Sequence, residues 1–361
     1  MSRASGPCVL VTGTGGGGLG EQMVKALRLS GSGYRVVCTD ITPFSTGLAR
    51  GDASEILPPA SADGYLEALL SACRRHGAEV VLPGSEAELK VLSARRDEVA
   101  AEGLFLPINS REVIERCMDK LALSRALDEL GIKAPRYVRI ASPEDVRDLP
   151  VFPMVFKPSK GSGGSANTFI VQTPEEARTI AQYLCAVYPE FIAQEYVGTP
   201  EREFTVGVLS DMDGNLLNSI ALRRHTLSAL GCRMKTPNRT GRAELGETLV
   251  ISSGISQGDI GPFPEVCGPC EKIAAALGSV GPCNIQLRLV DDHVYLFEIN
   301  PRFSGTTSLR AMVGFNEPDI LIRRHVLGES IAPRFPYGSG VIMRRLEESL
   351  VADAQAPGNA G

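Results

Sequence analysis

The residues best suited to chemistry lie late in the chain, in two segments that alternate polar and apolar side chains. The segments cover residues 282–290 and 294–300, and Asp291-Asp292-His293 separates them. Alternation on both sides of a short polar stretch predicts a β-hairpin with a three-residue loop. The loop length then fixes which residues of the two strands face each other.

This pairing would bring four polar side chains onto one face of the hairpin. Gln286 would face Glu298. Asn284 would face Asn300 on the same side, because side chains alternate between the two faces of a strand. A carboxylate and several amide oxygens are hard ligands, which Mg²⁺ prefers while phosphates fill its other positions. Arg302, just past the second strand, can stabilise a phosphoryl oxygen or a developing oxyanion. A purely structural hairpin would also alternate, but it would not need Asn, Gln and Glu on one face. The pattern therefore favours a magnesium and phosphate centre.

A second candidate site follows a short apolar run that starts at Phe152. The run predicts a strand that delivers Lys157 at its end, and Gly161-Ser162-Gly163-Gly164 follows shortly after. Glycine-rich backbone can bring N–H groups against phosphate oxygens. A flexible linker has the same composition, so the lysine at the strand end is what favours a phosphate site.

A third candidate is the extended segment Gln194-Glu195-Tyr196-Val197, followed by Glu203. Its backbone could pair with the edge of an adenine, and the carboxylate could accept hydrogen bonds from ribose hydroxyls. An edge strand with a solvated acid is the alternative, and the residues alone favour it.

The chain also carries a dinucleotide fingerprint near its start. Gly13-x-Gly15-x-x-Gly18 follows a strand-like run and opens a helix, and Asp40 ends the next strand. Alone, this pattern would predict an NAD-dependent oxidoreductase. A competing role for the same turn is to line the acceptor-substrate side of a cleft.

Substrate-binding residues are expected in a basic stretch between the third candidate and the hairpin. One or two of its arginines, for example Arg224, could bind a substrate carboxylate together with Arg310. A solvated loop is the favoured alternative. Glu86, after the third N-terminal strand, could receive an amine, and a surface acid is an equal alternative. The basic residues are Arg223, Arg224, His225, Arg233, Lys235, Arg239 and Arg242.

The elements that must position these residues fall into two patterns. The first 115 residues alternate strands and helices, which is typical of an open parallel sheet. A helix is then expected over residues 119–130, followed by short strands and a helix over residues 174–188. Strands dominate from residue 203 until a helix near residues 265–277. The N-terminal elements expected are strands at 9–11, 34–40 and 79–83 and helices at 21–30 and 64–76.

Composition limits the class of protein. The chain has 361 residues and a net charge of −5, which suggests two or three lobes and gives no sign of a basic nucleic-acid-binding face. Its nine cysteines are scattered, which is typical of reduced thiols. With no long apolar run and no signal-peptide pattern, the sequence predicts a cytoplasmic protein with no membrane partner.

Four segments together give the chain a family resemblance. They are Met118-Asp119-Lys120, Val155-Phe156-Lys157-Pro158, Asn284-Ile285-Gln286 and Glu298-Ile299-Asn300-Pro301-Arg302. In this order and spacing, from about residue 8 to residue 335, the chain resembles the ATP-grasp superfamily. The likeness is greatest to the carbamoyl-phosphate synthase large-chain branch, and extends to biotin carboxylase and amino-acid ligases.

The resemblance implies a role for each candidate. Lys120 and Lys157 would contact ATP phosphates, the loop of residues 161–165 would close over them as a lid, and Arg302 would steady the phosphoryl group and an acyl phosphate. The nucleotide and metal sets implied are Lys120, Lys157, Gly161, Ser162, Gly163, Gly164, Glu195, Tyr196, Val197 and Glu203 for ATP, and Gln286, Glu298 and Asn300 for one or two Mg²⁺ (or Mn²⁺) ions.

The resemblance also implies an architecture and a reaction. An N-terminal Rossmann-like pre-ATP-grasp α/β domain (1–115) would precede a two-lobed α+β ATP-grasp domain. Its small lobe (116–200) would carry the lid and its large lobe (201–335) the hairpin. A C-terminal extension (336–361) would follow, with a disordered end. The reaction would be ADP-forming ligation of a small carboxylic acid and an amine through an acyl phosphate.

Departures from the larger relatives narrow this expectation. The sequence has one such unit, no glutaminase nucleophile elbow and no biotin-carrier segment, which favours a stand-alone ligase. A carbamoyl-phosphate synthase-like or carboxylase-type enzyme stays open as an alternative, as does a homodimer. A non-enzymatic nucleotide sensor is disfavoured because the magnesium and arginine positions are intact, and ATP-grasp N-domains carry a similar glycine-rich turn without binding NAD.

Overall fold

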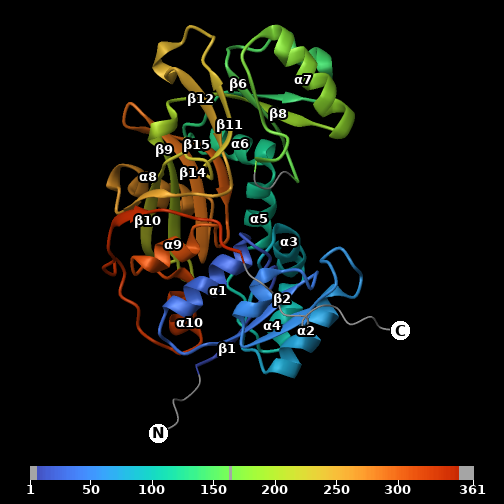
Figure 1. Cartoon of the computed structure of the whole chain (residues 1–361), viewed down its shortest axis with the longest axis vertical. Coiled ribbons are helices and arrows are strands. Elements are labelled where there is room, and N and C mark those ends of the chain that lie inside the picture. Colours follow the sequence, from blue (N-terminus) through green and yellow to red (C-terminus); the bar gives the residue numbers. More distant parts are fainter. Residues whose placement is uncertain (1–5, 162–164, 349–361) are drawn as a thin grey trace.

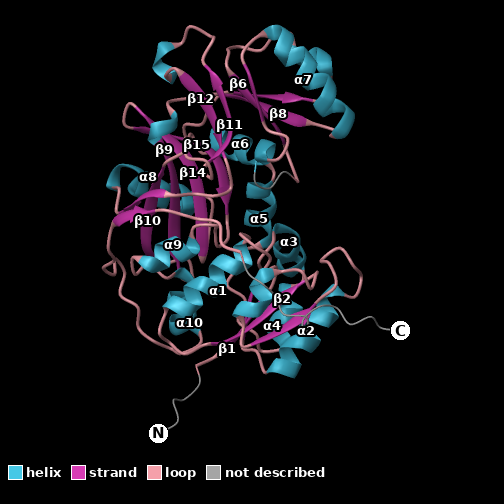
Figure 2. Ribbon diagram, in the orientation of Figure 1, coloured by secondary structure: helices cyan, strands magenta, loops and turns pink. Residues whose placement is uncertain are grey.

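The computed structural model describes residues 6–161 and 165–348. The predicted disorder of residues 352–361 and the lid positions Ser162, Gly163 and Gly164 lie outside the described residues. Figure 1 shows a large twisted sheet on one side of the molecule, with a smaller lobe at the top of the view and the N-terminal domain at the bottom. Figure 2 shows that both strands and helices contribute to each part, as the predicted α/β and α+β fold class requires.

The N-terminal domain is built on a parallel sheet in the order β3-β2-β1-β4. Val9, Leu10 and Val11 of the central strand are fully buried, because helices cover both faces of a parallel sheet. The elements are β1 (Cys8–Val11), α1 (Leu19–Leu29), β2 (Arg35–Asp40), β3 (Ala53–Ile56), α2 (Tyr65–His76), β4 (Val80–Leu82), α3 (Glu86–Ala94) and α4 (Arg96–Ala101).

The smaller lobe is an antiparallel sheet in the order β5-β8-β6-β7, covered on one face by α7. Two helices lead into this lobe, whereas the sequence predicts only the second. The two helices meet at Asp119, whose carboxylate caps the second helix. The elements are α5 (Arg111–Met118), α6 (Lys120–Glu129), β5 (Tyr137–Ile140), β6 (Met154–Pro158), β7 (Phe169–Val171), α7 (Pro174–Val187) and β8 (Phe191–Glu195).

The large sheet has the order β15-β14-β9-β10-β13-β16, and its strands are antiparallel. One face carries Val206, Ile285 and Leu287, which pack against α8. The other face is polar at its β15 side and forms the floor of the site described below. The elements are β9 (Glu203–Ser210), β10 (Leu216–Arg224), β13 (Gly258–Gly261), α8 (Pro264–Ala276), β14 (Pro282–Val290), β15 (His293–Asn300) and β16 (Gly340–Ile342), with a separate ribbon of β11 (Cys232–Pro237) and β12 (Thr248–Ser252).

Two late helices, α9 (Thr307–Met312) and α10 (Glu317–His325), pack against α1 of the N-terminal domain. Tyr34 and Ser32 both donate hydrogen bonds to Asp319, at 2.8 and 2.7 Å, which ties the start of the chain to α10. The expected division into domains stays a prediction, although its boundary at residue 115 falls inside α5, and the expected extension contributes β16 to the large sheet.

Candidate active site

The hairpin that carries the candidate metal residues has the predicted pairing but not the predicted loop. Gln286 pairs with Glu298 and Asn284 with Asn300. The loop is a two-residue turn, in which Asp291 and Asp292 both have positive φ angles (46° and 61°), as tight hairpin turns require. The expected three-residue loop is therefore wrong.

A bulge in β15 compensates for the shorter turn. Leu287 pairs with Leu296 and Gln286 with Glu298, so Phe297 is the extra residue of the bulge. Because side chains alternate with a period of two, a hairpin without this bulge would turn Glu298 to the opposite face. The bulge thus sets the carboxylate on the side of the polar amides.

The polar face continues from the hairpin onto β9 and β10. Glu203 of β9 pairs with Arg288 of β14, and it is only 2% exposed. One carboxylate oxygen accepts from Arg224 Nη1 at 3.1 Å, and the other accepts from Arg288 Nε and Nη2 at 3.1 and 2.9 Å. Two buried arginines on one carboxylate form a rigid charged floor, which explains how these three charges tolerate burial.

Gln286 bridges this floor to the carboxylate of the hairpin. Its Oε1 accepts from Arg224 Nη1 at 3.4 Å, and its Nε2 donates to Glu298 Oε2 at 3.0 Å. A guanidinium only donates and an ionised carboxylate only accepts, so the neighbours fix the amide orientation. A metal ion bound by Gln286 would have to replace the contact to Arg224.

Lys157 reaches the hairpin from the end of β6 in the smaller lobe. Its Nζ donates to the carbonyl oxygen of Phe297 at 2.9 Å, and the side chain is 7% exposed. Burial and, to a smaller extent, the charge of nearby Lys120 lower the pKa of Lys157 to about 7, although Glu298 opposes them. A bound polyphosphate would stabilise the protonated amine and so raise the pKa of Lys157 again.

The first turn of α6 places Lys120 beside Lys157. Asp119 Oδ1 accepts from the backbone of Leu121 and Ala122 at 3.0 and 3.1 Å. Ser159, just after β6, donates to the same oxygen at 2.6 Å, and its carbonyl accepts from the backbone N–H of Lys120 at 3.0 Å. The helix start is thereby fixed against the strand that carries Lys157.

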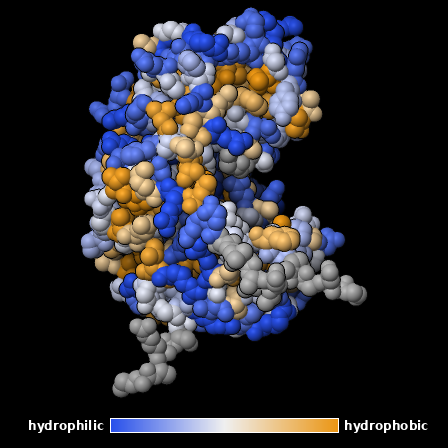
Figure 3. Space-filling model, in the orientation of Figure 1, coloured by the Kyte–Doolittle hydropathy of each residue, from blue (hydrophilic) through white to orange (hydrophobic). Residues whose placement is uncertain are grey.

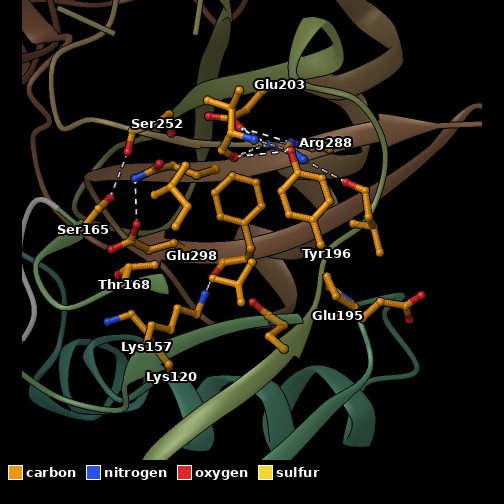
Figure 4. Close-up of a pocket in the computed structure, with 18 residues that line it drawn as sticks. Lys120, Lys157, Ser165, Thr168, Glu195, Tyr196, Glu203, Ser252, Arg288 and Glu298 are labelled. Carbon is orange, nitrogen blue, oxygen red and sulfur yellow. Dashed lines mark hydrogen bonds and ion pairs between the residues drawn. The ribbon is translucent and has the colours of Figure 1, made fainter. Parts of the chain in front are cut away.

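One cavity collects most of the predicted nucleotide residues, between the smaller lobe and the polar face of the large sheet. In Figure 4, Lys157 and Lys120 lie on one side of it, and Glu203, Arg288 and Ser252 lie on the other. The residues expected to bind ATP or the metal that line it are Lys120, Lys157, Glu195, Tyr196, Val197, Glu203, Gln286 and Glu298.

Tyr196 closes one end of this cavity. Its ring stacks on the guanidinium of Arg288, with Cζ 4.3 Å from the ring centre. Its hydroxyl accepts from the backbone N–H of Val250 at 2.8 Å. Glu195 is held by ion pairs to Arg242 and Arg136 at 3.2 and 3.3 Å. The wall is therefore flat and rigid, which suits an aromatic base.

A second cavity adjoins the first and shares Gln286, Glu298 and Ser165 with it. Asn284, Asn300, Arg302 and Arg224 line it from the large lobe, and Glu86 and residues 16–18 line it from the N-terminal domain. The molecule is hollowed on the side where the lobe with α7 faces the N-terminal domain (Figure 3). The predicted magnesium and phosphate residues thus lie between the nucleotide cavity and a cavity that two domains build.

Arg302 and Glu86 lie next to each other in the wall of this second cavity. Arg302 Nη2 lies 3.4 Å from Glu86 Oε1. Arg302 Nη1 donates to the carbonyl of Phe303, whereas its buried Nε has no partner among the described residues. The long ion pair and the unpaired nitrogen leave both groups able to bind a ligand.

The glycine-rich turn lines the second cavity and does not present a dinucleotide site. The Glu21 carboxylate accepts from the backbone N–H of Gly17 at 2.5 Å, where a pyrophosphate would need that donor. A turn at residues 46–50 also packs on the loop, since a Cβ at Gly47 would lie 1.8 Å from the carbonyl of Thr14. This geometry favours the role of lining the cleft.

The chemistry of the donor set fits a nucleotide-bound Mg²⁺. Among the described residues, no group of three or more His, Cys, Asp or Glu could hold a metal ion by itself. A magnesium ion that arrives with phosphates needs only one or two protein carboxylates. Glu298 supplies one, and Asn300 supplies an amide beside it in β15.

Comparison with known families decides the class of the chain. Residues 117–306 match the model of the ATP-grasp domain. The chain belongs to the ATP-grasp family. Residues 9–106 match the PylC-like N-terminal domain, so both the predicted family and the predicted fold class are confirmed.

Relatives of this ATP-grasp protein include the large chain of carbamoyl phosphate synthase from Thermoplasma volcanium. The two are 25% identical over 303 residues, which is 80% of this chain and 26% of the relative. The chain thus spans about a quarter of the length of this curated relative.

Solved structures of similar fold include two enzymes. L-amino acid ligase from Bacillus licheniformis has a TM-score of 0.62 at 17% identity, over 92% of this chain and 78% of the other. Biotin carboxylase from Campylobacter jejuni, named as a β-γ-ATP complex, has a TM-score of 0.60 at 16% identity, over 88% of this chain and 70% of the other.

Some predicted substrate residues of this ATP-grasp chain lie elsewhere than expected. Arg310 is 1% exposed and lines neither cavity, so a direct contact with a substrate carboxylate is not what its position favours. Arg224 lines the second cavity but is 4% exposed and engaged with Glu203. Gly161, expected in the lid, lines a separate groove beside α5 and α6.

Other basic residues of the stretch 223–242 form surface ion pairs, as the solvated alternative predicts. Arg223 and His225 both contact Asp259, and Arg239 contacts Glu176. Sequence reasoning missed Arg288, whose place in the polar alternation of β14, two residues after Gln286, was the available signal.

Proposed function

We propose that this chain is an ATP- and Mg²⁺-dependent (or Mn²⁺-dependent) ligase that joins a small carboxylic acid to an amine. The supporting observation is that Lys120 and Lys157 face Glu298 across one cavity, with Arg302 in the adjoining one. Two lysines in the first cavity and an arginine in the second, with the Glu298 carboxylate shared by both cavities, suit transfer of a phosphoryl group from ATP to a second substrate.

The chain's own residues would divide the reaction as follows. The flat wall at Tyr196 and Val197 would hold the base, and Glu203 the ribose. Lys120 and Lys157 would bind the phosphates. Glu298 and Asn300, with Gln286 once released from Arg224, would hold Mg²⁺, which supplies charge neutralisation on the phosphates when bound.

The second cavity would hold the acid and the amine. Arg302 would stabilise the negative charge on the acid carboxylate and on the acyl phosphate. Glu86, beside Arg302, would accept a proton from the amine as the C–N bond forms and phosphate leaves.

The decisive experiment is a screen for ADP release with the full chain, Mg²⁺ and ATP over amino acids, small acids and bicarbonate, with mass spectrometry of the products. An amide product with ADP supports the proposal. Bicarbonate dependence would instead favour the carbamoyl-phosphate synthase-like or carboxylase-type alternative. AMP and pyrophosphate would refute the acyl phosphate, and tight NAD(H) binding without ATP binding would favour an oxidoreductase.

We also infer that the partners are these small molecules and that the protein acts in the cytoplasm. The nine cysteines are free thiols, as in reducing compartments. No described helix is both long enough and apolar enough to span a membrane. A homodimer is the oligomeric state to test, by light scattering across protein concentrations, since one solved neighbour is named as a dimer.

A further inference from the structure

Arg310 of α9 lies under the polar face of the large sheet, with almost no contact with solvent. Its side chain is 1% exposed, and its Nη1 lies 2.8 Å from Glu317 Oε1, which is itself fully buried. Its Nη2 donates to Asn284 Oδ1 at 2.7 Å. The ion pair therefore connects two helices of the C-terminal part to one amide of the candidate site.

A glycine makes room for this contact. Asn284 pairs with Gly207 on β9 and with Asn300 on β15. A Cβ at Gly207 would lie 2.4 Å from Arg310 Nη1, so a side chain there would push the guanidinium away. Glycine weakens a strand interior, and here its absence of a side chain lets Arg310 reach Asn284.

The contact fixes which way the amide of Asn284 points. A guanidinium can only donate, so the atom that faces Arg310 is the amide oxygen. Thr205 Oγ1 donates to the same oxygen at 2.8 Å. With both lone pairs of Oδ1 engaged, Nδ2 is the group left to face the cavity that Asn284 lines with Arg302 and Asn300.

Building on the proposed function, we propose that Asn284 determines specificity for the acid substrate, and that Arg310 is its positioning residue. Nδ2 donates a hydrogen bond to an oxygen of the substrate carboxylate, and keeps that bond as the group becomes the carbonyl of an acyl phosphate. This assigns Asn284 to the acid, whereas Glu298 and Asn300 serve the metal.

A metal-binding experiment separates these roles without any acid. Mn²⁺ is titrated, by electron paramagnetic resonance, into the full chain with a non-hydrolysable ATP analogue. Asn284→Leu should stay within about threefold of the wild type, whereas Glu298→Gln should bind Mn²⁺ at least about tenfold more weakly. If Asn284→Leu weakens Mn²⁺ as much as Glu298→Gln does, Asn284 is a ligand and the proposal is overturned.

A kinetic experiment tests the hydrogen bond from Asn284 Nδ2, with the acid that the ADP-release screen identifies as the substrate. Asn284→Asp keeps an oxygen for Arg310 and Thr205, so the fold is retained, but it turns a second oxygen toward the substrate. The KM for the acid should rise at least about tenfold while the KM for ATP changes less than about twofold. Arg310→Met should act in the same way, and Arg310→Lys, which still donates, should restore most of the affinity. An unchanged KM for the acid in Asn284→Asp would overturn the proposal.

A wild-type chain that releases no ADP with any acid would refute the proposed function separately. Inorganic phosphate, titrated by calorimetry into the Mg²⁺·ADP complex, then serves as the oxyanion probe. Weaker phosphate binding by Asn284→Asp would support the amide donor, and equal binding would overturn it.

Discussion

The side-chain amine of Lys157 donates to the carbonyl of Phe297, the one residue of β15 that the strand pairing leaves over. A bulge frees its carbonyl from the regular ladder. The irregularity that turns Glu298 toward the cavity therefore also holds the lysine from the opposite lobe. Nucleotide phosphates would compete with this carbonyl for the same amine.

Proton uptake should accompany nucleotide binding. Because the free pKa of Lys157 is lowered to about 7, the amine is mostly neutral at pH 8, and bound phosphates raise its pKa again. Binding of a non-hydrolysable ATP analogue at pH 8 should take up nearly one proton, and affinity should fall up to about tenfold per pH unit above 7. Calorimetry in buffers of different ionisation enthalpy measures this. Lys157→Arg stays charged and should show no uptake from this position, so unchanged uptake in that variant would contradict the assignment.

Deletion of Phe297 should leave the metal site in place but remove the contact that holds Lys157. Glu298 would then follow Leu296 directly and still face Gln286, so Mn²⁺ binding, measured by electron paramagnetic resonance, should stay within about threefold of the wild type. The bulge carbonyl that accepts from Lys157 Nζ would be lost, so ADP release should fall at least about tenfold because the lysine is misplaced. Insertion of a glycine between Asp291 and Asp292, in the exposed turn, is the matched control and should change neither quantity. Mn²⁺ binding by the deletion variant as weak as that of Glu298→Gln would contradict the retained register.

Glu298→Gln should weaken metal binding and catalysis while the fold persists. The amide keeps the shape of the side chain and loses its charge, so ADP release should fall about 100-fold or more. Glu98→Gln, at a solvent-exposed ion pair with Arg95, should leave the rate unchanged. Full activity of Glu298→Gln would rule out its place at the metal.

The buried ion pairs of Glu203 with Arg224 and Arg288, under the nucleotide cavity, should contribute strongly to the free energy of unfolding. Glu203→Gln removes the charge that two buried arginines share, so the free energy of unfolding should fall by about 3–5 kcal/mol. Asp259→Asn, at the exposed pair with Arg223, should change it by less than about 1 kcal/mol. Urea denaturation of both variants measures the difference, and equal losses would show that burial does not decide the effect.

The sequence predicted the polar face of the hairpin because alternation is local and regular. Its loop length could not be read in the same way, because two departures from regularity, a shorter turn and a bulge at Phe297, offset each other. The pairing of Gln286 with Glu298 was therefore right although the turn was wrong. A bulge depends on tertiary contacts such as the one with Lys157, which no local pattern records.

Residue type alone could not separate the arginines of the site. Arg302 was assigned to a phosphoryl group, whereas Arg224 and Arg310 were candidates for a substrate carboxylate by residue type alone. Their roles differ because Glu203 pairs with Arg224 and Glu317 pairs with Arg310. Each partner lies on a different strand or helix from its arginine, so no local pattern reveals the pair. β3 and β16 also escaped prediction, because most of their residues are exposed or half-buried and neither has the continuous buried apolar run of β1 or β4.

The position of β16 at the edge of the large sheet bears on synthesis of the protein. It pairs with β13, which precedes the whole hairpin in the chain, and Arg344, just beyond it, contacts the Gly305 carbonyl beside the second cavity. On the ribosome, β13 emerges long before β16, its partner at this edge of the sheet. The nascent chain thus exposes an unpaired strand edge until late in translation, the stage at which partly folded chains associate.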